Sequence, residues 1–361
     1  MRIYEIITPS RIGGAETQVV TLTKALQAMG DDVWVFCPQG RPFADYLLAQ
    51  GITPVSWKTH GKVDPMTIWR HAAFIKRRDV EIVHAHLTSG AFLGSLGAHW
   101  AGRPCIATVH GFTNPGWYQH ADLLIAVSPA VKDHLLTYDV EEEKIRVITN
   151  GIPIHQYAVS TVTEAKLALG LNPVVPRVGI VGRLSPEKGQ DLALRAWPKV
   201  LSQAPNAHLV LIGDGQMLEE WQALAQKLGI AAVVEFAGFV ADPRAAMAAC
   251  DLIVVPSRKE GLGLAAVEAM ALARPVVATA VGGLKGVVVD SVTGLFVPTE
   301  DVATLALTIA GLLRNPARAI RLGAYGRQHA QTHFDVARQV ALLRDTFAET
   351  IQSRYALSTR K

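Results

Sequence analysis

Charged and aromatic residues are scarce in this chain of 361 residues, at 18% and 7% of the total. The 35 basic and 31 acidic residues leave a net charge of only +4, which excludes the concentrated basic surface typical of a nucleic-acid-binding protein. Cysteines are also few. Cys37, Cys105 and Cys250 are odd in number and far apart, so we expect no disulfide framework and a reducing, cytoplasmic compartment.

Long hydrophobic runs are missing as well, so we expect neither a secretory signal nor a membrane span. The longest stretch without Asp, Glu, Lys or Arg covers residues 82–102, and it contains three histidines and four glycines. This composition favours a buried strand followed by a helix of small residues over a transmembrane helix.

What the sequence does contain is a repeated alternation of short β-branched runs with helical patterns, which predicts parallel sheets covered on both faces. The pattern stops in residues 152–176 and then restarts, so we predict two doubly wound, Rossmann-like α/β domains and a strand-free helical tail. The predicted strands are Arg2–Ile7, Asp32–Phe36, Thr53–Trp57, Val80–Ala85, Cys105–Val109, Leu123–Val127, Ile145–Thr149, Arg177–Val181, His208–Ile212, Val233–Phe236, Leu252–Val255, Pro275–Ala280 and Leu295–Val297.

In the first half, the first strand leads into Gly13 and Gly14 at the start of a helix. Paired glycines let a ligand approach the backbone, although a plain strand-to-helix turn explains them equally well. The pattern is not Gly-x-Gly-x-x-Gly, which disfavours an NAD site. His84 and His86 share one face of a strand, but no nearby carboxylate or thiol completes a metal site, so we expect no metal. His110 follows a central strand and is expected to point into the interdomain crevice, although an ordinary core or surface histidine explains it equally well.

In the second half, Arg183 and Lys188 flank a strand-to-helix turn that ends at Gly189. A guanidinium fork and an ammonium at this position are suited to a diphosphate, whereas the alternative is two solvated side chains. Gly213 and Gly215 follow the next strand. They mark either a second place where a ligand can approach the backbone closely or only a tight turn.

The most informative stretch follows the strand Leu252–Val255 and holds two glutamates, Glu260 and Glu268. Residues 261–264 lie between them, where a loop becomes a helix, and their backbone N–H groups are suited to phosphate. Glu260 is expected to reach ligand hydroxyls from the loop. Glu268 falls in the second helical turn, where its carboxylate can accept from two ribose hydroxyls.

Together these motifs resemble glycosyltransferase family 4, the retaining nucleotide-sugar glycosyltransferases of the GT-B fold. The similar segments occur in the family's order along nearly the whole chain, and the glutamate pair is the most specific of them. They are residues 13–16, 79–86, 108–111, 127–128, 149–152, 182–183, 187–189, 213–215, 260–268 and 293–298.

The resemblance implies a GT-B architecture in which two domains face a central cleft. Residues 1–160 would form an acceptor-side domain, residues 161–339 a donor domain, and a last helix at 340–357 would pack back on the first domain. The implied catalytic residues are His110, Arg183, Lys188 and Glu260. The implied donor-binding residues are Gly13, Gly14, Asn150, Gly182, Gly213, Gly215, Gly261, Leu262, Gly263, Leu264 and Glu268.

The implied reaction transfers a sugar from a UDP- or GDP-sugar to a hydroxyl of a glycan or lipid-linked acceptor, as in bacterial cell-surface polysaccharide or lipopolysaccharide synthesis. Arg183, Lys188 and a helix N-terminus would stabilise the leaving diphosphate, and the chain has no Asp-x-Asp motif, so no metal or other cofactor is expected. Another GT-B enzyme, such as an epimerase, and a non-catalytic nucleotide-sugar binding protein are the alternatives.

The basic, partly amphipathic segment 66–78 allows peripheral contact with the inner face of an anionic membrane. A solvated helix that packs its apolar side on the sheet is the competing interpretation. No nucleic-acid partner is expected.

Overall fold

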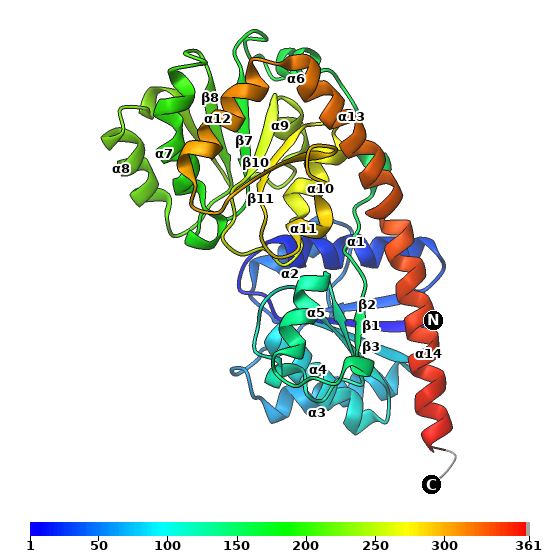
Figure 1. Ribbon diagram of the computed structural model, residues 1–361. Helices are drawn as coiled ribbons and strands as arrows, with labels where there is room; N and C mark the ends of the chain where they lie inside the picture. Colours follow the sequence, from blue (N-terminus) through cyan, green and yellow to red (C-terminus); the bar gives the residue numbers. More distant parts are fainter. Residues whose placement is uncertain (359–361) are drawn as a thin grey trace. The chain divides into compact units, whose positions relative to one another are not determined.

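A computed structural model describes residues 1–358 of the chain, which divide into two compact units (Figure 1). The first unit consists of Met1–Ile152 together with the segment that begins at Val336, and the second is Pro153–Asp335. The chain therefore passes between the units at 152/153 and 335/336, whereas the sequence had suggested 160/161 and 339/340. Both units are α/β and each contains one six-stranded sheet.

The sheet of the first unit is entirely parallel, in the order β2-β1-β3-β4-β5-β6. Its strands are β1 (Arg2–Ile7), β2 (Asp32–Phe36), β3 (Ile82–His86), β4 (Cys105–Val109), β5 (Leu123–Ala126) and β6 (Ile145–Val147). Its α-helices are α1 (Gly14–Ala28), α2 (Pro42–Ala49), α3 (Pro65–Arg77), α4 (Thr88–Ala101), α5 (Pro129–Leu136) and α14 (Val336–Ser358).

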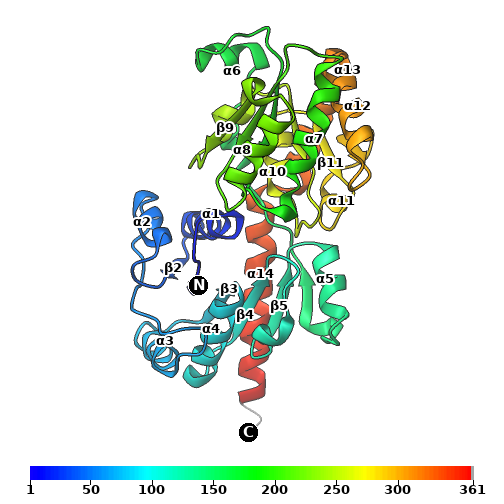
Figure 2. The same cartoon turned by 90° about the vertical axis from the view of Figure 1, so that its left-hand side faces the viewer.

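Alternate residues of β1 and β3 point to opposite faces of this sheet. Ile3 and Ile82 pack in one apolar cluster with Val340 and Phe347 of α14. On the other face, a Cβ placed on Gly94 of α4 would touch Ile6 and Ala85. Helix α14 thus covers the β1 and β3 face opposite α4, and both views show it running beside the strands of this unit (Figures 1 and 2).

The predicted strand Thr53–Trp57 is wrong, because this segment makes only an isolated bridge between Val55 and Phe36 at the edge of the sheet. Pro54 lacks an N–H group and cannot donate to a ladder, which limits the pairing to a few bonds. The stretch 82–102 does form a buried strand followed by a helix, β3 and α4, as expected. Within residues 1–358, no helix combines the length and the apolar character needed to cross a bilayer. All three cysteines are free and buried.

The sheet of the second unit is also parallel, in the order β12-β11-β10-β7-β8-β9. Its strands are β7 (Arg177–Val181), β8 (His208–Ile212), β9 (Val234–Gly238), β10 (Leu252–Val255), β11 (Val276–Thr279) and β12 (Gly294–Val297). Its α-helices are α6 (Val162–Ala168), α7 (Gln190–Leu201), α8 (Leu218–Lys227), α9 (Arg244–Ala248), α10 (Leu264–Ala271), α11 (Leu284–Val287), α12 (Val302–Leu313) and α13 (Pro316–His333).

In each sheet the strand order reverses at one point, between β1 and β3 in the first unit and between β7 and β10 in the second. Open parallel sheets bind ligands beyond the carboxyl ends of the strands at such a switch point. Gly13 and His86 flank the first switch point, and Gly182 and Glu260 lie in the loops that flank the second.

Two glycines allow the loops around the second switch point to pack backbone against backbone. Gly189 has φ +66°, and a Cβ on it would overlap the carbonyl oxygen of Pro256. Gly213 has φ +144°, and a Cβ there would overlap the carbonyl oxygen of Gly182. Side chains at these positions would force the loops after β7, β8 and β10 apart.

Candidate active site

Lys188 and Glu260 meet beside the second switch point, although 72 residues separate them in sequence. The Lys188 Nζ atom lies 2.9 and 2.7 Å from the two carboxylate oxygens of Glu260. Ser257, which is buried, donates its hydroxyl to the same carboxylate at 3.0 Å. The site therefore places a cation and a hydroxyl around a carboxylate whose side chain is only 12% exposed.

Arg183, the other predicted cation, begins the loop after β7 and is exposed. Its carbonyl accepts from Gln190, but within residues 1–358 its guanidinium makes no hydrogen bond or ion pair. A Cβ on the adjacent Gly182 would lie 3.9 Å from the aliphatic part of Lys188. The Arg183 guanidinium is thus available to bind an incoming anion. The neighbouring Lys188 is already paired with Glu260.

The loop that carries Glu260 leads directly into α10, with Gly263 at its N-cap in the left-handed region at φ +103°. The first N–H groups of a helix have no acceptor within the helix, and they favour negative charge. Leu262 is buried and Gly283 packs on the Gly261 carbonyl, which fixes the course of this turn. The predicted segment 261–264 therefore lies at an anion-favouring helix terminus next to Lys188 and Glu260.

Glu268 lies in α10, one helical turn beyond its start. Its carboxyl group accepts a hydrogen bond of 3.2 Å from the Tyr157 hydroxyl, and the Arg244 guanidinium lies 5.6 Å from the centre of the Tyr157 ring. Burial raises the pKa of Glu268 to about 7. Sequence reasoning missed Tyr157 and Arg244, since nothing local in the sequence links them to Glu268.

At the switch point of the first unit, Gly13 caps α1 and Gly14 begins it. Glu16 lies in the first turn of this helix, and burial raises the pKa of its carboxyl group. The N-terminus of this helix therefore already holds an acidic side chain of its own.

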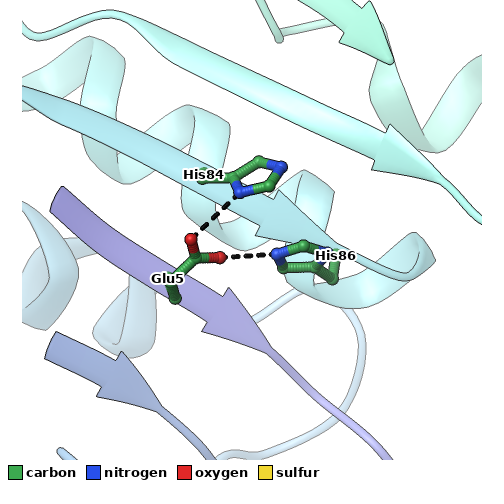
Figure 3. Close-up of side chains that lie close together, drawn as sticks. All are labelled: Glu5, His84 and His86. Atoms are coloured by element: carbon green, nitrogen blue, oxygen red, sulfur yellow. Dashed lines mark hydrogen bonds and ion pairs between the residues drawn. The ribbon is translucent and has the colours of Figure 1, made fainter. Parts of the chain in front are cut away.

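A second carboxylate lies deeper in the first unit, between two histidines (Figure 3). Glu5 of β1 lies 3.1 Å from His84 Nδ1 and 2.6 Å from His86 Nε2, both on β3. All three side chains are fully buried. The expectation that no carboxylate accompanies the two histidines was wrong, because β1 pairs with β3 in a register that sets Glu5 opposite His84.

His110 follows β4, and its Nε2 atom lies 3.0 Å from His86 Nδ1. Burial lowers its pKa well below the usual range of histidine. Asn150 is also buried, and its Oδ1 accepts from Gln339 of α14 at 3.4 Å. Gln339 in turn accepts from the Gly151 N–H at 2.7 Å, so Asn150 belongs to a network that anchors α14.

The structure thus brings together Gly182, Lys188 and Glu260 by contact, with Gly213 against Gly182 and Gly261 to Leu264 in the adjoining loop. Gly215 likewise packs against the Leu184 carbonyl. Gly13, Gly14, His110 and Asn150 belong to the other unit. Two parallel doubly wound sheets, one with cationic side chains at its switch point, define a protein of the nucleotide-binding α/β class.

Comparison with known proteins narrows this class to one family. The family model described as "Glycosyl transferases group 1" matches residues 163–329, and that described as "Glycosyltransferase Family 4" matches residues 12–156. A D-inositol 3-phosphate glycosyltransferase of Frankia alni is 30% identical over 87% of this chain and 90% of its own length. The chain belongs to the family 4, or group 1, glycosyltransferases.

A relative of the same name from Segniliparus rotundus is 35% identical, and the match covers 58% of this chain and 48%, about half, of that protein. Crystal structures of Anabaena Alr3699/HepE with UDP and with UDP-glucose share the fold at a TM-score of 0.85. HepE is 24% identical and is similar over 97% of this chain and at least 99% of its own. The predicted GT-B fold class and the family resemblance are confirmed.

Proposed function

We propose that the protein is a retaining glycosyltransferase that moves a hexose from a UDP- or GDP-sugar to a hydroxyl of a glycan or lipid-linked acceptor. The observation that carries this proposal is the Lys188–Glu260 pair, with the unpaired Arg183 in the neighbouring loop. This set offers cations for a diphosphate and a carboxylate for sugar hydroxyls at the place where doubly wound sheets bind nucleotides. Family membership supports the same activity.

The chemistry follows from where charge develops. As the bond between the anomeric carbon and the phosphate oxygen breaks, the nucleoside diphosphate gains negative charge and the sugar becomes oxocarbenium-like. Arg183, Lys188 and the α10 N-terminus would stabilise the diphosphate. The acceptor oxygen would attack the same face of the sugar, and its proton would pass to the departing phosphate oxygen. Glu260 would accept from sugar hydroxyls, because its carboxylate is already bound by Lys188 and Ser257.

Two cationic side chains and a helix terminus can neutralise the leaving group, so we propose that transfer needs no metal ion. The measurement is the rate of transfer with EDTA and with added Mg²⁺ or Mn²⁺. Equal rates support the proposal, and a rate that depends on the metal contradicts it.

A donor screen tests the activity itself. The protein is incubated with UDP-, GDP- and ADP-sugars, with and without candidate acceptors, and release of nucleoside diphosphate is measured. A glycosyltransferase releases it and does so faster with the right acceptor. An epimerase would interconvert sugars without coupled transfer, and a binding protein would retain the donor unchanged.

The acceptor belongs, in our proposal, to cell-surface polysaccharide or lipopolysaccharide synthesis. Two relatives are named D-inositol 3-phosphate glycosyltransferase. The screen should therefore also include a phosphorylated polyol among its candidate acceptors. Acceptor-stimulated release of diphosphate, followed by NMR assignment of the new linkage and its anomeric configuration, would identify the product and test retention.

Helix α3 supports a peripheral membrane contact. Its exposed face carries Met66 and Trp69, which are 53% and 58% exposed, and then the basic residues Lys76 and Arg77. An apolar anchor beside cations suits the interface of an anionic bilayer. The opposite face packs inward, with Ile68 and Ile75 buried.

Co-sedimentation with vesicles tests this contact. We expect binding to phosphatidylglycerol vesicles and little to phosphatidylcholine vesicles, with loss of binding when Lys76, Arg77 and Arg78 are changed to Gln. A variant with Arg314, Arg318 and Arg321 of the second unit changed to Gln alters the net charge equally and should still bind. Absence of binding by the unaltered protein would contradict the contact.

A further inference from the structure

A continuous chain of hydrogen bonds runs from Glu5 to the imidazole of His110. Glu5 Oε2 lies 2.6 Å from His86 Nε2, and His86 Nδ1 lies 3.0 Å from His110 Nε2. On its other arm, Glu5 Oε1 lies 3.1 Å from His84 Nδ1, and His84 Nε2 lies 2.7 Å from the Thr108 hydroxyl. Figure 3 shows how the two imidazoles converge on the one carboxylate.

The carboxylate fixes the direction of every bond in the arm that leads to His110. Burial opposes ionisation of Glu5, but its two histidine partners outweigh burial and lower the pKa of its carboxyl group, so at neutral pH its oxygens only accept. His86 must therefore carry a proton on Nε2. Burial lowers the pKa of His86 to about 4, so its ring is neutral and its Nδ1 has a free lone pair. That nitrogen can only accept, and His110 Nε2 must donate to it.

This order leaves the other nitrogen of His110 without a proton. The His110 ring is neutral at pH 7, since burial lowers its pKa, and its one proton lies on Nε2. His110 Nδ1 is buried and finds no hydrogen-bond partner among the described residues. A buried acceptor with no donor is costly, and a hydroxyl group supplied by a ligand would remove that cost.

We propose that Glu5 is a positioning residue which, through His86, holds His110 in the Nε2–H tautomer and so presents Nδ1 as an acceptor for a hydroxyl of the sugar substrate. The tautomer inference rests on the hydrogen-bond geometry together with the neutral state of the buried His86 and His110 rings, and the choice of a sugar hydroxyl rests on the proposed function. An imidazole with the reverse tautomer would offer a donor there and would select a different ligand group.

Glu5, His84 and His86 are also a possible set of metal ligands, as their ligand atoms all lie within 4.8 Å of one another. A metal would need the ring nitrogens that face Glu5 to be unprotonated. The hydrogen bonds to Glu5 need those nitrogens protonated, so the two states exclude each other. Elemental analysis of the purified protein distinguishes them, and stoichiometric Zn²⁺ that is lost on Glu5→Leu would overturn the proposal.

The tautomer can be read directly by ¹⁵N–¹H correlation NMR on protein labelled at histidine, with His110→Gln to assign the signals. At pH 7 we expect a pyrrole-like Nε2 and a pyridine-like Nδ1 for His110. A protonated Nδ1, or an imidazolium, would overturn the proposal. This readout does not depend on activity, so it stands apart from success or failure of the donor screen.

Two variants separate positioning from simple structural damage. Glu5→Leu removes the acceptor that orients His86 and should give His110 a mixture of tautomers. Thr108→Val removes a buried hydrogen bond of the other arm and should leave the His110 signals unchanged. If Glu5→Leu fails to fold, His86→Phe removes the same orientation from the adjacent position. An unchanged single tautomer in the variant that folds would contradict the positioning role.

Kinetics with deoxygenated donors test the ligand group. For the unaltered protein and for Thr108→Val, we expect one monodeoxy analogue of the active donor to lower kcat/KM about ten-fold. Glu5→Leu should already lower kcat/KM about ten-fold with the parent donor. Replacing the parent donor with that analogue should then lower kcat/KM of this variant little further. If the analogue lowers kcat/KM of Glu5→Leu by a further ten-fold, His110 does not receive this hydroxyl.

Discussion

Single side chains set the charge of the site in the second unit. Lys188 and Glu260 largely neutralise each other, whereas Arg183 adds an exposed positive charge that no described residue balances. In the proposed reaction, the diphosphate would contact the exposed Arg183 and would share Lys188 with Glu260. Substitutions of Arg183, Lys188 and Glu260 should therefore differ in how they affect activity and stability.

We expect Arg183→Ala, Lys188→Ala and Glu260→Ala each to lower kcat/KM for transfer about 100-fold or more, because each removes stabilisation of the donor or of the leaving group. Arg183→Ala should leave the melting temperature unchanged, since its guanidinium has no partner in residues 1–358 to lose. Arg195→Ala, on the exposed side of α7, serves as the control and should retain activity. Full activity of the Lys188 variant would contradict the diphosphate role.

Glu268 should make donor binding dependent on pH. Its pKa of about 7 means that the carboxylate form, which in the proposed role would accept from two ribose hydroxyls, becomes dominant only above neutrality. We expect KM for the donor to fall as pH rises from 6 to 8, and Glu268→Gln to flatten this dependence at a higher KM. A profile of the unaltered protein that does not change in this range would contradict the assignment.

The same raised pKa has the opposite effect on stability. The folded protein holds the proton more tightly than the unfolded chain, so this contribution is present at acidic pH and is lost as pH rises through about 7. Glu268→Gln should therefore raise the melting temperature relative to the unaltered protein at pH 8 by more than at pH 5. Calorimetry at the two pH values checks the sign.

The side chains that carry local sequence signals were predictable, and their partners were not. Lys188 and Glu260 each follow a strand at a glycine-rich turn, and parallel strands bring such turns to one edge. Tyr157 comes from the segment that joins the units, and Glu5 is a lone acid in an apolar strand. Their contacts depend on the strand order and register, which local patterns do not determine.

Among the elements, the loop between β7 and α7 allows a matched test of backbone contact. Gly189 and Gly170 have nearly the same φ, +66° and +67°, but only Gly189 packs on another carbonyl, whereas Gly170 has open space around it. We expect Gly170→Ala to cost about 1 kcal/mol of unfolding free energy for its left-handed backbone, and Gly189→Ala about 3 kcal/mol because it also overlaps Pro256. Urea denaturation measures both, and equal losses would contradict the packing argument.

Element boundaries were predictable where apolar periodicity dominates and less so where proline intervenes. Strands β1, β2, β4, β7, β8 and β10 begin and end as predicted. A single proline altered the edge segment around Pro54, and helix α9 begins only after Pro243, at Arg244. The short helices α6 and α11 were not predicted, since four to seven residues give too little periodicity.

The first unit as a whole depends on a helix from the far end of the chain. Phe347 of α14 is fully buried against the sheet, and its ring lies 5.3 Å from that of His84. We expect Phe347→Ala to destabilise the first unit by about 3–5 kcal/mol through the cavity it leaves. Leu342→Ala, at a position 41% exposed on the same helix, should cost far less. Scanning calorimetry checks this, and similar losses for both variants would contradict the packing of α14.

This dependence on α14 also bears on how the chain folds during synthesis. The strands of the first unit are translated before the second unit, but the helix that covers one of their faces is translated after it. The second unit is continuous in sequence and can fold while translation proceeds. Until α14 has been made, Ile3, Ile82 and Ile106 lack the part of their apolar cluster that this helix supplies. During that interval the nascent amino-terminal half would be a natural client for chaperones that bind apolar strands.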